Sequence, residues 1–197
     1  MASAPLDGLR ERKKARTRAS IREHALRLFR EQGYQATTVE QVAEAAEVSP
    51  STFFRYFPTK EDVVLQDDFD LIQVEAFESQ PADMSVIAAY RAAAGQMFAS
   101  LSPDELARFR ESVELTLTIP EVRARALDEF AKAIDVTAEA IARRTGRAPD
   151  DPAVRSVSGA LVGVVMAATM PWSSQPAEDM FDRIDAGLAH LEAGLPL

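Results

Sequence analysis

The chain has 197 residues, of which 47% are apolar and 27% charged, and its formal net charge is −9. This apolar content is enough to bury a sizeable core, so a disordered chain is excluded. Because the sequence contains no cysteine, disulfides and thiolate metal sites are excluded, and a reducing, cytoplasmic location is expected.

The charge is divided unevenly along the chain. Residues 1–60 hold 11 Lys and Arg against 7 Asp and Glu, a balance of +4, whereas residues 61–197 hold 11 against 24, a balance of −13. A basic head on an acidic body indicates a protein that presents its head to nucleic acid, because phosphates attract the head and repel the body.

The first predicted helix starts in a basic run. Residues 1–9 show no periodicity and are expected to form a mobile tail, whereas residues 10–18 read Arg-Glu-Arg-Lys-Lys-Ala-Arg-Thr-Arg. Such a run is either a solvated helix start or a contact surface for phosphates. Gly33 fits the position after the end of this helix. Its apolar face has helical spacing and consists of Ile21, Ala25, Leu28 and Phe29.

Two short helices follow, each with its own start signal. Thr38 can cap the first helix because its hydroxyl accepts an N–H of the first turn, and Gln41 completes a capping box. Ser49 can cap the second helix, and Pro50 takes its first position, where a missing N–H is harmless. This helix is expected to end before Pro58, because proline disfavours helical geometry in the preceding residue. Helix, tight turn and helix form the motif that carries a recognition helix into the DNA major groove.

These residues also resemble a known family. Residues 38–61 read Thr-x-x-x-Val-Ala-x-x-Ala-x-Val-Ser-x-x-Thr-Phe-Phe-x-Tyr-Phe-x-x-Lys-Glu, which is similar to the signature of the TetR-type transcriptional regulators. Two positions depart from it. Glu47 replaces the usual turn glycine, and a left-handed backbone there would cost about 1 kcal/mol. Phe54 replaces a tyrosine that usually contacts a phosphate, so that hydroxyl contact is lost.

The second short helix is expected to have a core side and a DNA side. Phe53 and Phe57, one turn apart, would face the core. Arg55 is the candidate for a bidentate guanine contact worth about 1–3 kcal/mol of discrimination, with a phosphate contact as the alternative. Pro50 and Phe54 can contact thymine methyl groups. The side opposite the core offers Ser51, Thr52, Arg55 and Tyr56.

Other contacts would fix the head on the DNA backbone. The resemblance implies phosphate contacts for Tyr56 and Lys60, and Lys60 also lies in the first turn of its helix, where N–H groups attract anions. Thr38 can add a phosphate contact to its cap, and the basic run before the motif is interpreted as a phosphate contact. The predicted DNA-binding set is Arg16, Arg18, Thr38, Ser49, Pro50, Ser51, Thr52, Phe54, Arg55, Tyr56 and Lys60.

The rest of the chain shows helix signals and no strand alternation. A helix that opens at Thr59 is expected to run towards Gln80, and Gly146 marks a later helix end. Further helix starts are marked at Asp83, Ser102, Pro120, Asp151 and Pro176. The sequence therefore predicts an all-α protein. We assign residues 1–58 to a helix-turn-helix DNA-binding domain and residues 59–197 to a larger helical domain for effector binding and dimerisation, the latter roles being implied by the resemblance.

One apolar segment requires a test against a membrane span. Residues 156–177 carry no charge, and residues 157–172 are mostly apolar. A spanning helix needs about 20 predominantly apolar residues. This run is shorter, contains serine, glycine and threonine, and stops at Pro171, so we expect a buried helix and no membrane partner.

The resemblance implies a homodimer built by the last two helices. Two heads on a twofold axis would read a palindromic operator in double-stranded DNA. A stripe of small residues in residues 156–167 would allow close helix approach, although such a stripe can equally pack within one chain. The predicted dimer interface is Ser156, Gly159, Ala160, Gly163, Ala167, Ile184, Leu188 and Leu191.

The resemblance also implies a small-molecule effector whose binding releases a repressor from its operator. Few charged residues interrupt the candidate faces, so a mostly hydrophobic effector is expected, with Arg110 or Glu114 as a polar contact. The alternative is that these apolar residues fill the core. The predicted pocket is lined by Phe98, Phe109, Val113, Leu117, Phe130, Met166, Met170 and Trp172.

Two other classes of function remain as alternatives. An enzyme would need convergent nucleophile, base or metal ligands, but His24 and His190 lie at opposite ends of the chain, with no zinc-site spacing. No catalytic residue, metal or cofactor is predicted. A helical scaffold protein with a coincidental head pattern is the second alternative, which binding to DNA would exclude.

Overall fold

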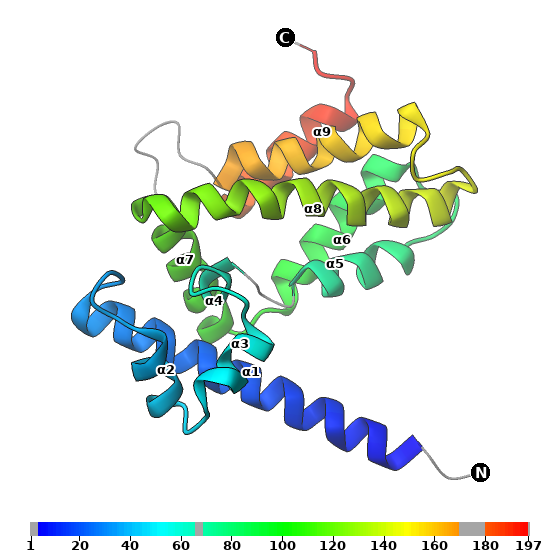
Figure 1. The fold of residues 1–197 in the computed structure, drawn as a ribbon. Helices are drawn as coiled ribbons and strands as arrows, with labels where there is room; N and C mark the ends of the chain where they lie inside the picture. The colour runs from blue at the N-terminus through cyan, green and yellow to red at the C-terminus, as the bar shows by residue number, and fades with distance from the viewer. Residues whose placement is uncertain (1–3, 66–68, 170–179, 197) are drawn as a thin grey trace. The chain divides into compact units, whose positions relative to one another are not determined.

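The computed structural model describes residues 4–65, 69–169 and 180–196, and all regular structure in these ranges is helical (Figure 1). The predicted all-α fold is therefore confirmed. The helices are α1 Ala4–Gln32, α2 Val39–Ala45, α3 Pro50–Tyr56, α4 Asp62–Leu65, α5 Phe69–Glu78, α6 Val86–Ser100, α7 Pro103–Thr118, α8 Pro120–Thr145, α9 Pro152–Thr169 and α10 Met180–Glu192.

The chain divides into two compact units, residues 1–66 and residues 67–197. Helix α4 packs against α1 and so belongs to the first unit, which extends past residue 58, where the sequence analysis drew its boundary. Helix α1 begins at Ala4, so residues 4–9 are helical and not the tail that was expected. Residues 4–9 have no apolar stripe in the sequence, so periodicity could not indicate this part of the helix.

The first unit is a small bundle in which α1 packs on α2 and α4, and α2 packs on α3. Figure 1 shows the N-terminal half of α1 extending beyond the other helices of this unit. Gly33 ends α1 as predicted: its φ is 87°, and its N–H donates to the carbonyl of Phe29 at 3.0 Å. The core of the unit is apolar and includes the buried Ile21, Ala25, Leu26, Phe29, Val42, Ala43, Phe53, Phe57, Val63 and Val64.

The second unit is built around α8, which contacts α5, α7 and α9, while α10 contacts α6 and α9. The predicted helix start at Ser102 is confirmed by a capping box, in which Ser102 Oγ accepts from Glu105 N and Glu105 accepts from Ser102 N. Gly146, with φ 69°, ends α8 as predicted. Helix α6 is capped by Ser85 and not by Asp83.

Two other predicted helices fall partly outside the described residues. The helix expected to run from Thr59 towards Gln80 is described as α4 and α5, and residues 66–68 between them are not described. The predicted helix start at Pro176 lies outside the described residues, and α10 is described from Met180.

Helix α9 corresponds to the apolar segment of the sequence. By length and composition alone it meets the criteria of a membrane-spanning helix, criteria that a core helix also meets, and 28% of it is buried. It packs against α8 and α10. Gly187 allows the close approach of α10, because a Cβ at this position would lie 2.6 Å from Cγ1 of Val164.

Candidate nucleic-acid interface and effector region

The helix-turn-helix starts with the capping box that the sequence predicts. Thr38 Oγ1 accepts from Gln41 N at 3.3 Å, and Gln41 Oε1 accepts from Thr38 N at 2.9 Å. These bonds satisfy N–H groups that have no partner inside α2. Thr38 itself is exposed, so the first turn of α2 is fixed locally while its surface stays accessible.

The turn between α2 and α3 is a Schellman motif closed without glycine. Glu47 N donates to Glu44 O at 3.0 Å, and Val48 N donates to Ala43 O at 2.9 Å, the two bonds that define the motif. Glu47 has φ 54°, so the left-handed backbone expected at this departure from the family pattern is confirmed. A left-handed backbone at a non-glycine residue costs about 1 kcal/mol of conformational free energy, and the turn forms in spite of that cost.

Helix α3 is anchored by its cap and by two phenylalanines. Ser49 Oγ accepts from Thr52 N at 3.1 Å, and Pro50 takes the first helical position. Phe53 and Phe57 are both 0% exposed, with ring centroids 5.9 Å apart. The predicted core side of α3 is therefore confirmed, and the two buried rings anchor the helix in the core of the first unit.

The opposite side of α3 is open. Pro50, Ser51 and Arg55 are exposed, and Phe54 is 50% exposed, which is unusual for a large apolar side chain. The guanidinium carbon of Arg55 lies 5.4 Å from the ring centroid of Tyr56. This cation–π contact orders the Arg55 side chain, which remains exposed to solvent.

Lys60 holds the loop between α1 and α2. Its Nζ donates to the carbonyls of Tyr34 at 2.9 Å and Thr37 at 3.1 Å, and it lies 3.9 Å from the centroid of the Tyr34 ring. The sequence assigned this ammonium to a phosphate. In the structure it satisfies two carbonyls next to Thr38, the cap of α2. Residue spacing could not reveal this contact, because Lys60 and Tyr34 are far apart in the sequence.

Glu61 holds the same loop from the next position. The Tyr34 hydroxyl donates to Glu61 Oε1 at 2.6 Å. Partial burial on its own would raise the pKa of Glu61, but hydrogen bonds from Tyr34, the backbone and Thr59, with the charge of Lys60, bring that pKa below its ordinary value. The carboxylate is therefore the favoured form in this cluster.

The basic run lies on α1. Arg16 is exposed, whereas Arg18 is partly buried, with its guanidinium carbon 5.3 Å from the centroid of the Phe57 ring. Arg18 thus joins α1 to the end of α3 through a cation–π contact. The structure gives Arg16 and Arg18 different surroundings, which their similar place in the sequence did not indicate.

In the second unit, part of the predicted effector pocket is packed with aromatic rings. The ring centroids of Phe98 and Phe181 are 4.1 Å apart, and those of Phe109 and Phe181 are 5.9 Å apart. Phe98, Phe109 and Val113 pack against the core of this unit, as the core-filling alternative described. Leu117, Phe130 and Met166 are partly buried, and Met170 and Trp172 lie outside the described residues.

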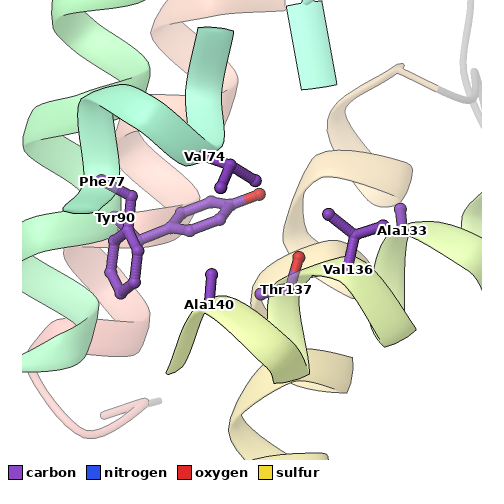
Figure 2. Close-up of a pocket in the computed structure, with 7 residues that line it drawn as sticks. All are labelled: Val74, Phe77, Tyr90, Ala133, Val136, Thr137 and Ala140. Atoms are coloured by element: carbon purple, nitrogen blue, oxygen red, sulfur yellow. The ribbon is translucent and has the colours of Figure 1, made fainter. Parts of the chain in front are cut away.

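A pocket is present between α5, α6 and α8, and it contains none of the residues predicted for the effector (Figure 2). Figure 2 shows the phenol of Tyr90 extending from α6 towards Val74 of α5, with the Thr137 hydroxyl of α8 facing the same space. The pocket is lined by Val74, Phe77, Tyr90, Ala133, Val136, Thr137 and Ala140. Side-chain periodicity in a sequence cannot show that three helices leave a space beside Tyr90.

The predicted dimer interface divides into buried and accessible residues. Ile184 and Leu188 are 3% and 0% exposed within one chain, so their side chains pack in the core of the second unit. Leu191 also packs against this core. On α9, Ser156, Gly163 and Ala167 are exposed, and Gly159 and Ala160 are partly exposed.

Two family models match the chain. The model described as bacterial regulatory proteins, tetR family, matches residues 21–66, and the model described as the MftR C-terminal domain matches residues 84–196. The chain is 46% identical over 96 residues to the HTH-type transcriptional regulator TcmR of Streptomyces glaucescens, a match that spans 46% of this chain and 42% of TcmR. It is 26% identical over 187 residues, 93% of each chain, to MftR of Mycobacterium tuberculosis, which is named for regulation of mycofactocin biosynthesis.

Solved structures share the fold. FadR of Thermus thermophilus, described as a TetR family transcriptional repressor in complex with lauroyl-CoA, has a TM-score of 0.56 and 26% identity over 91% of this chain and 95% of FadR. A TetR-family protein of Syntrophomonas wolfei has a TM-score of 0.61 and 18% identity over 93% of this chain and 98% of that protein. The chain therefore belongs to the TetR family of bacterial regulatory proteins and is a DNA-binding transcriptional regulator with an MftR-type C-terminal domain.

Proposed function

We propose that this regulator is a repressor that binds a palindromic operator as a homodimer and leaves it when a small, mostly hydrophobic effector binds. The observation that carries the proposal is the open side of α3, where Pro50, Ser51, Phe54 and Arg55 are exposed above a rigid core. A short helix of this kind, presented by a tight turn, fits the major groove.

Base recognition is assigned to Arg55 and the apolar residues beside it. A guanidinium can bind guanine O6 and N7 together, and an aromatic edge can contact a thymine methyl group. Phe54 is 50% exposed and has no hydroxyl, so its contribution to the interface is apolar contact. We also propose DNA contacts for three further residues of α3: Ser51, Thr52 and Tyr56. The contacts with the DNA backbone that position the protein are proposed for Thr38, Ser49 and Arg16.

The test of this assignment is binding of the full chain to the promoter region beside its own gene, measured by fluorescence anisotropy across salt concentrations. Arg55→Met is expected to reduce discrimination at one base position by about 5- to 150-fold, while binding to random DNA changes little. Arg27→Met is the matched control, because Arg27 lies on α1 and not on α3 and pairs with Glu31 at 2.9 Å. Equal losses for operator and random DNA in Arg55→Met would show that Arg55 reads no base.

Dimerisation is assigned to the accessible face of α9. A Cβ added at Gly159 or Gly163 would meet no atom within 4 Å, so this face is open in the single chain. Small residues on it would let two helices approach closely. Ile184 and Leu188 are buried in the core of one chain, so the proposal is made for the accessible residues of α9.

Gly163→Glu tests the interface against a matched glycine. Gly95 on α6 is also exposed, with open space where its Cβ would lie, so Gly95→Glu makes the same change elsewhere. Light scattering after size-exclusion chromatography is expected to show a dimer for the wild type and Gly95→Glu, and a monomer for Gly163→Glu. A dimer in all three would place the interface elsewhere.

A hydrophobic effector is supported by the apolar residues of the second unit and by FadR, a relative at 26% identity that was solved with lauroyl-CoA. Repression is tested with a reporter under the chain's own promoter. Deletion of the regulator should raise reporter expression, and addition of the effector should do the same. A fall in expression on deletion would identify an activator.

A further inference from the structure

We propose that the N-terminal part of α1, residues 4–18, is a second DNA-binding element that lies against the duplex on the outer flank of each half-site. These residues are called the arm. The proposal rests on the proposed operator binding and adds to it a sequence-independent contact, in which Arg10 and Lys14 bind phosphates. The tetR family model matches residues 21–66, so the arm lies outside the part of the chain that this model matches.

The arm carries the net positive charge of the head. Residues 10–18 contain six Lys and Arg against one Glu, a balance of +5. Residues 19–60, which include the helix-turn-helix, contain five Lys and Arg against five Glu, a balance of zero. Sequence-independent affinity for DNA comes from cations that neutralise phosphates. The charge available for that purpose is therefore concentrated in the arm and not around α3.

The cations of the arm continue the side of α1 that is buried farther along the helix. Ile21 and Ala25 are both 0% exposed. Steps of three, four and four residues back from Ile21 lead to Arg18, Lys14 and Arg10, so all five positions share one side of the helix. This stripe is apolar in the core of the first unit and becomes cationic in the arm, where Arg10 and Lys14 are exposed.

Arg18 connects the stripe to α3. Its guanidinium carbon lies 5.3 Å from the centroid of the Phe57 ring, and Phe57 is the C-cap residue of α3. The side of α1 that carries Arg10 and Lys14 is therefore the side that meets the end of α3. Figure 1 shows the helix continuing from there beyond the other helices of the first unit.

The arm is long enough to reach DNA beyond the bases that α3 would read. At about 1.5 Å per residue, Arg10 lies about 12 Å and Ala4 about 21 Å along the helix from Arg18. Base pairs are about 3.4 Å apart along the duplex, so the arm spans about 6 base pairs. Lys14 and Arg10 can thus contact phosphates outside a half-site while α3 stays in its groove.

Electrostatic repulsion favours the outer flanks over the space between the two half-sites. In the proposed dimer, arms that met at the twofold axis would bring together two runs with a balance of +5 each, and like charges repel. On the outer flanks the two arms are apart, and each faces a duplex with one phosphate charge per about 1.7 Å.

The composition of the arm favours DNA over an anionic membrane surface. Residues 10–18 contain a single apolar residue, Ala15. A helix that binds in a membrane interface needs a face of large apolar side chains. A densely charged polyanion such as the phosphate backbone requires no such face, because the attraction is electrostatic and gains from the release of counterions.

Two duplexes of different length test the proposal with the full chain. Footprinting on the promoter region beside its own gene first defines the half-sites. One duplex ends at the outer base pair of each half-site, and the other continues for about 8 base pairs of arbitrary sequence, which exceeds the reach of the arm. By fluorescence anisotropy the wild type should bind the longer duplex about 10- to 100-fold more tightly near physiological salt, whatever the flanking sequence.

A double variant and a matched control assign this preference to the arm. Arg10→Gln with Lys14→Gln should bind both duplexes equally. On the longer duplex it should lower the slope of log K against log salt by about 1.8 for each subunit, or about 3.6 for the dimer. Arg27→Gln with Arg30→Gln removes two charges from the last two turns of the same helix and should keep the preference of the wild type. Circular dichroism verifies that both variants are folded.

The outcomes separate the arm from the proposed function. Equal binding of the two duplexes by the wild type would overturn the arm while operator binding stands, and so would an unchanged preference in the double variant. Equal losses in the double variant and its control would reduce the effect to overall charge. Equal binding of the two duplexes together with sedimentation on phosphatidylserine vesicles would assign the arm to a membrane surface. If the wild type binds neither duplex, the proposed function itself fails.

Discussion

Replacement of Lys60 decides between two roles for one ammonium group. The family resemblance assigns it to a DNA phosphate, whereas the structure shows it donating to the carbonyls of Tyr34 and Thr37 at 2.9 and 3.1 Å. Lys60→Met keeps most of the length of the side chain and removes the charge. The two roles predict different losses.

If Lys60 holds the loop, Lys60→Met costs stability. The variant loses two hydrogen bonds from a charged donor and a cation–π contact, which together are worth about 2 kcal/mol at a partly exposed site. For a chain of this length the expected fall in Tm is about 4–8 °C. Operator binding should weaken moderately, since the carbonyl of Thr37 lies next to the cap of α2.

The salt dependence of operator binding separates the roles. Each phosphate that a protein charge neutralises contributes about 0.9 to the slope of log K against log salt. Lys60→Met is expected to leave this slope nearly unchanged, whereas Arg16→Met, at an exposed position of the basic run, should lower it by about 0.9 for each subunit, or about 1.8 for the dimer. An unchanged Tm with a slope lowered by that amount in Lys60→Met would refute the structural role and restore the phosphate contact.

Three further predictions follow from single positions. Glu47→Gly should stabilise the chain by about 1 kcal/mol, because φ is 54° at this residue, and chemical denaturation would detect the gain; a loss would show that the turn is unstrained. Glu61→Gln should destabilise the chain at pH 7, because the lowered pKa of Glu61 gives stability that is present above the ordinary glutamate pKa of 4.5. That stability is lost as the carboxylate protonates, so the difference from wild type should shrink as the pH falls below 4.5. A difference independent of pH would contradict this. Gly187→Ala should lower stability by about 1–2 kcal/mol through its contact with the stiff Val164, whereas Gly95→Ala, in open space, should not, and equal effects on thermal unfolding would argue against close packing of α9 and α10.

Local signals predicted the helix-turn-helix closely. The caps at Thr38 and Ser49, the position of Pro50 and the left-handed backbone at Glu47 all follow from bonds between residues a few positions apart. Such bonds are encoded by spacing, so a single sequence contains them. The contact of Lys60 with Tyr34 depends on how α4 packs against α1, and spacing carries no information about that packing.

In the second unit, periodicity leaves more open. It identified Phe98 and Phe109 as inward residues, but it could not distinguish side chains that fill a space from side chains that surround one. Both are partly buried and pack against the core. The pocket formed instead beside Ala133 and Ala140, where small residues on α8 leave a gap. A space between packed helices is not indicated by any single residue of the sequence.

Burial within one chain shows which sides of helix α9 are covered by its own chain, which periodicity alone does not show. It is apolar in almost every direction, a pattern that predicts cover on more than one side. Its own chain provides part of that cover, through α8 and through the contact of Val164 with Gly187. Gly163 and Ala167 remain exposed, on a helix of which 28% is buried. Because exposed apolar surface on a long helix is costly in water, the open side of α9 supports the proposed dimer, in which a second copy with the same small residues would cover it by twofold symmetry.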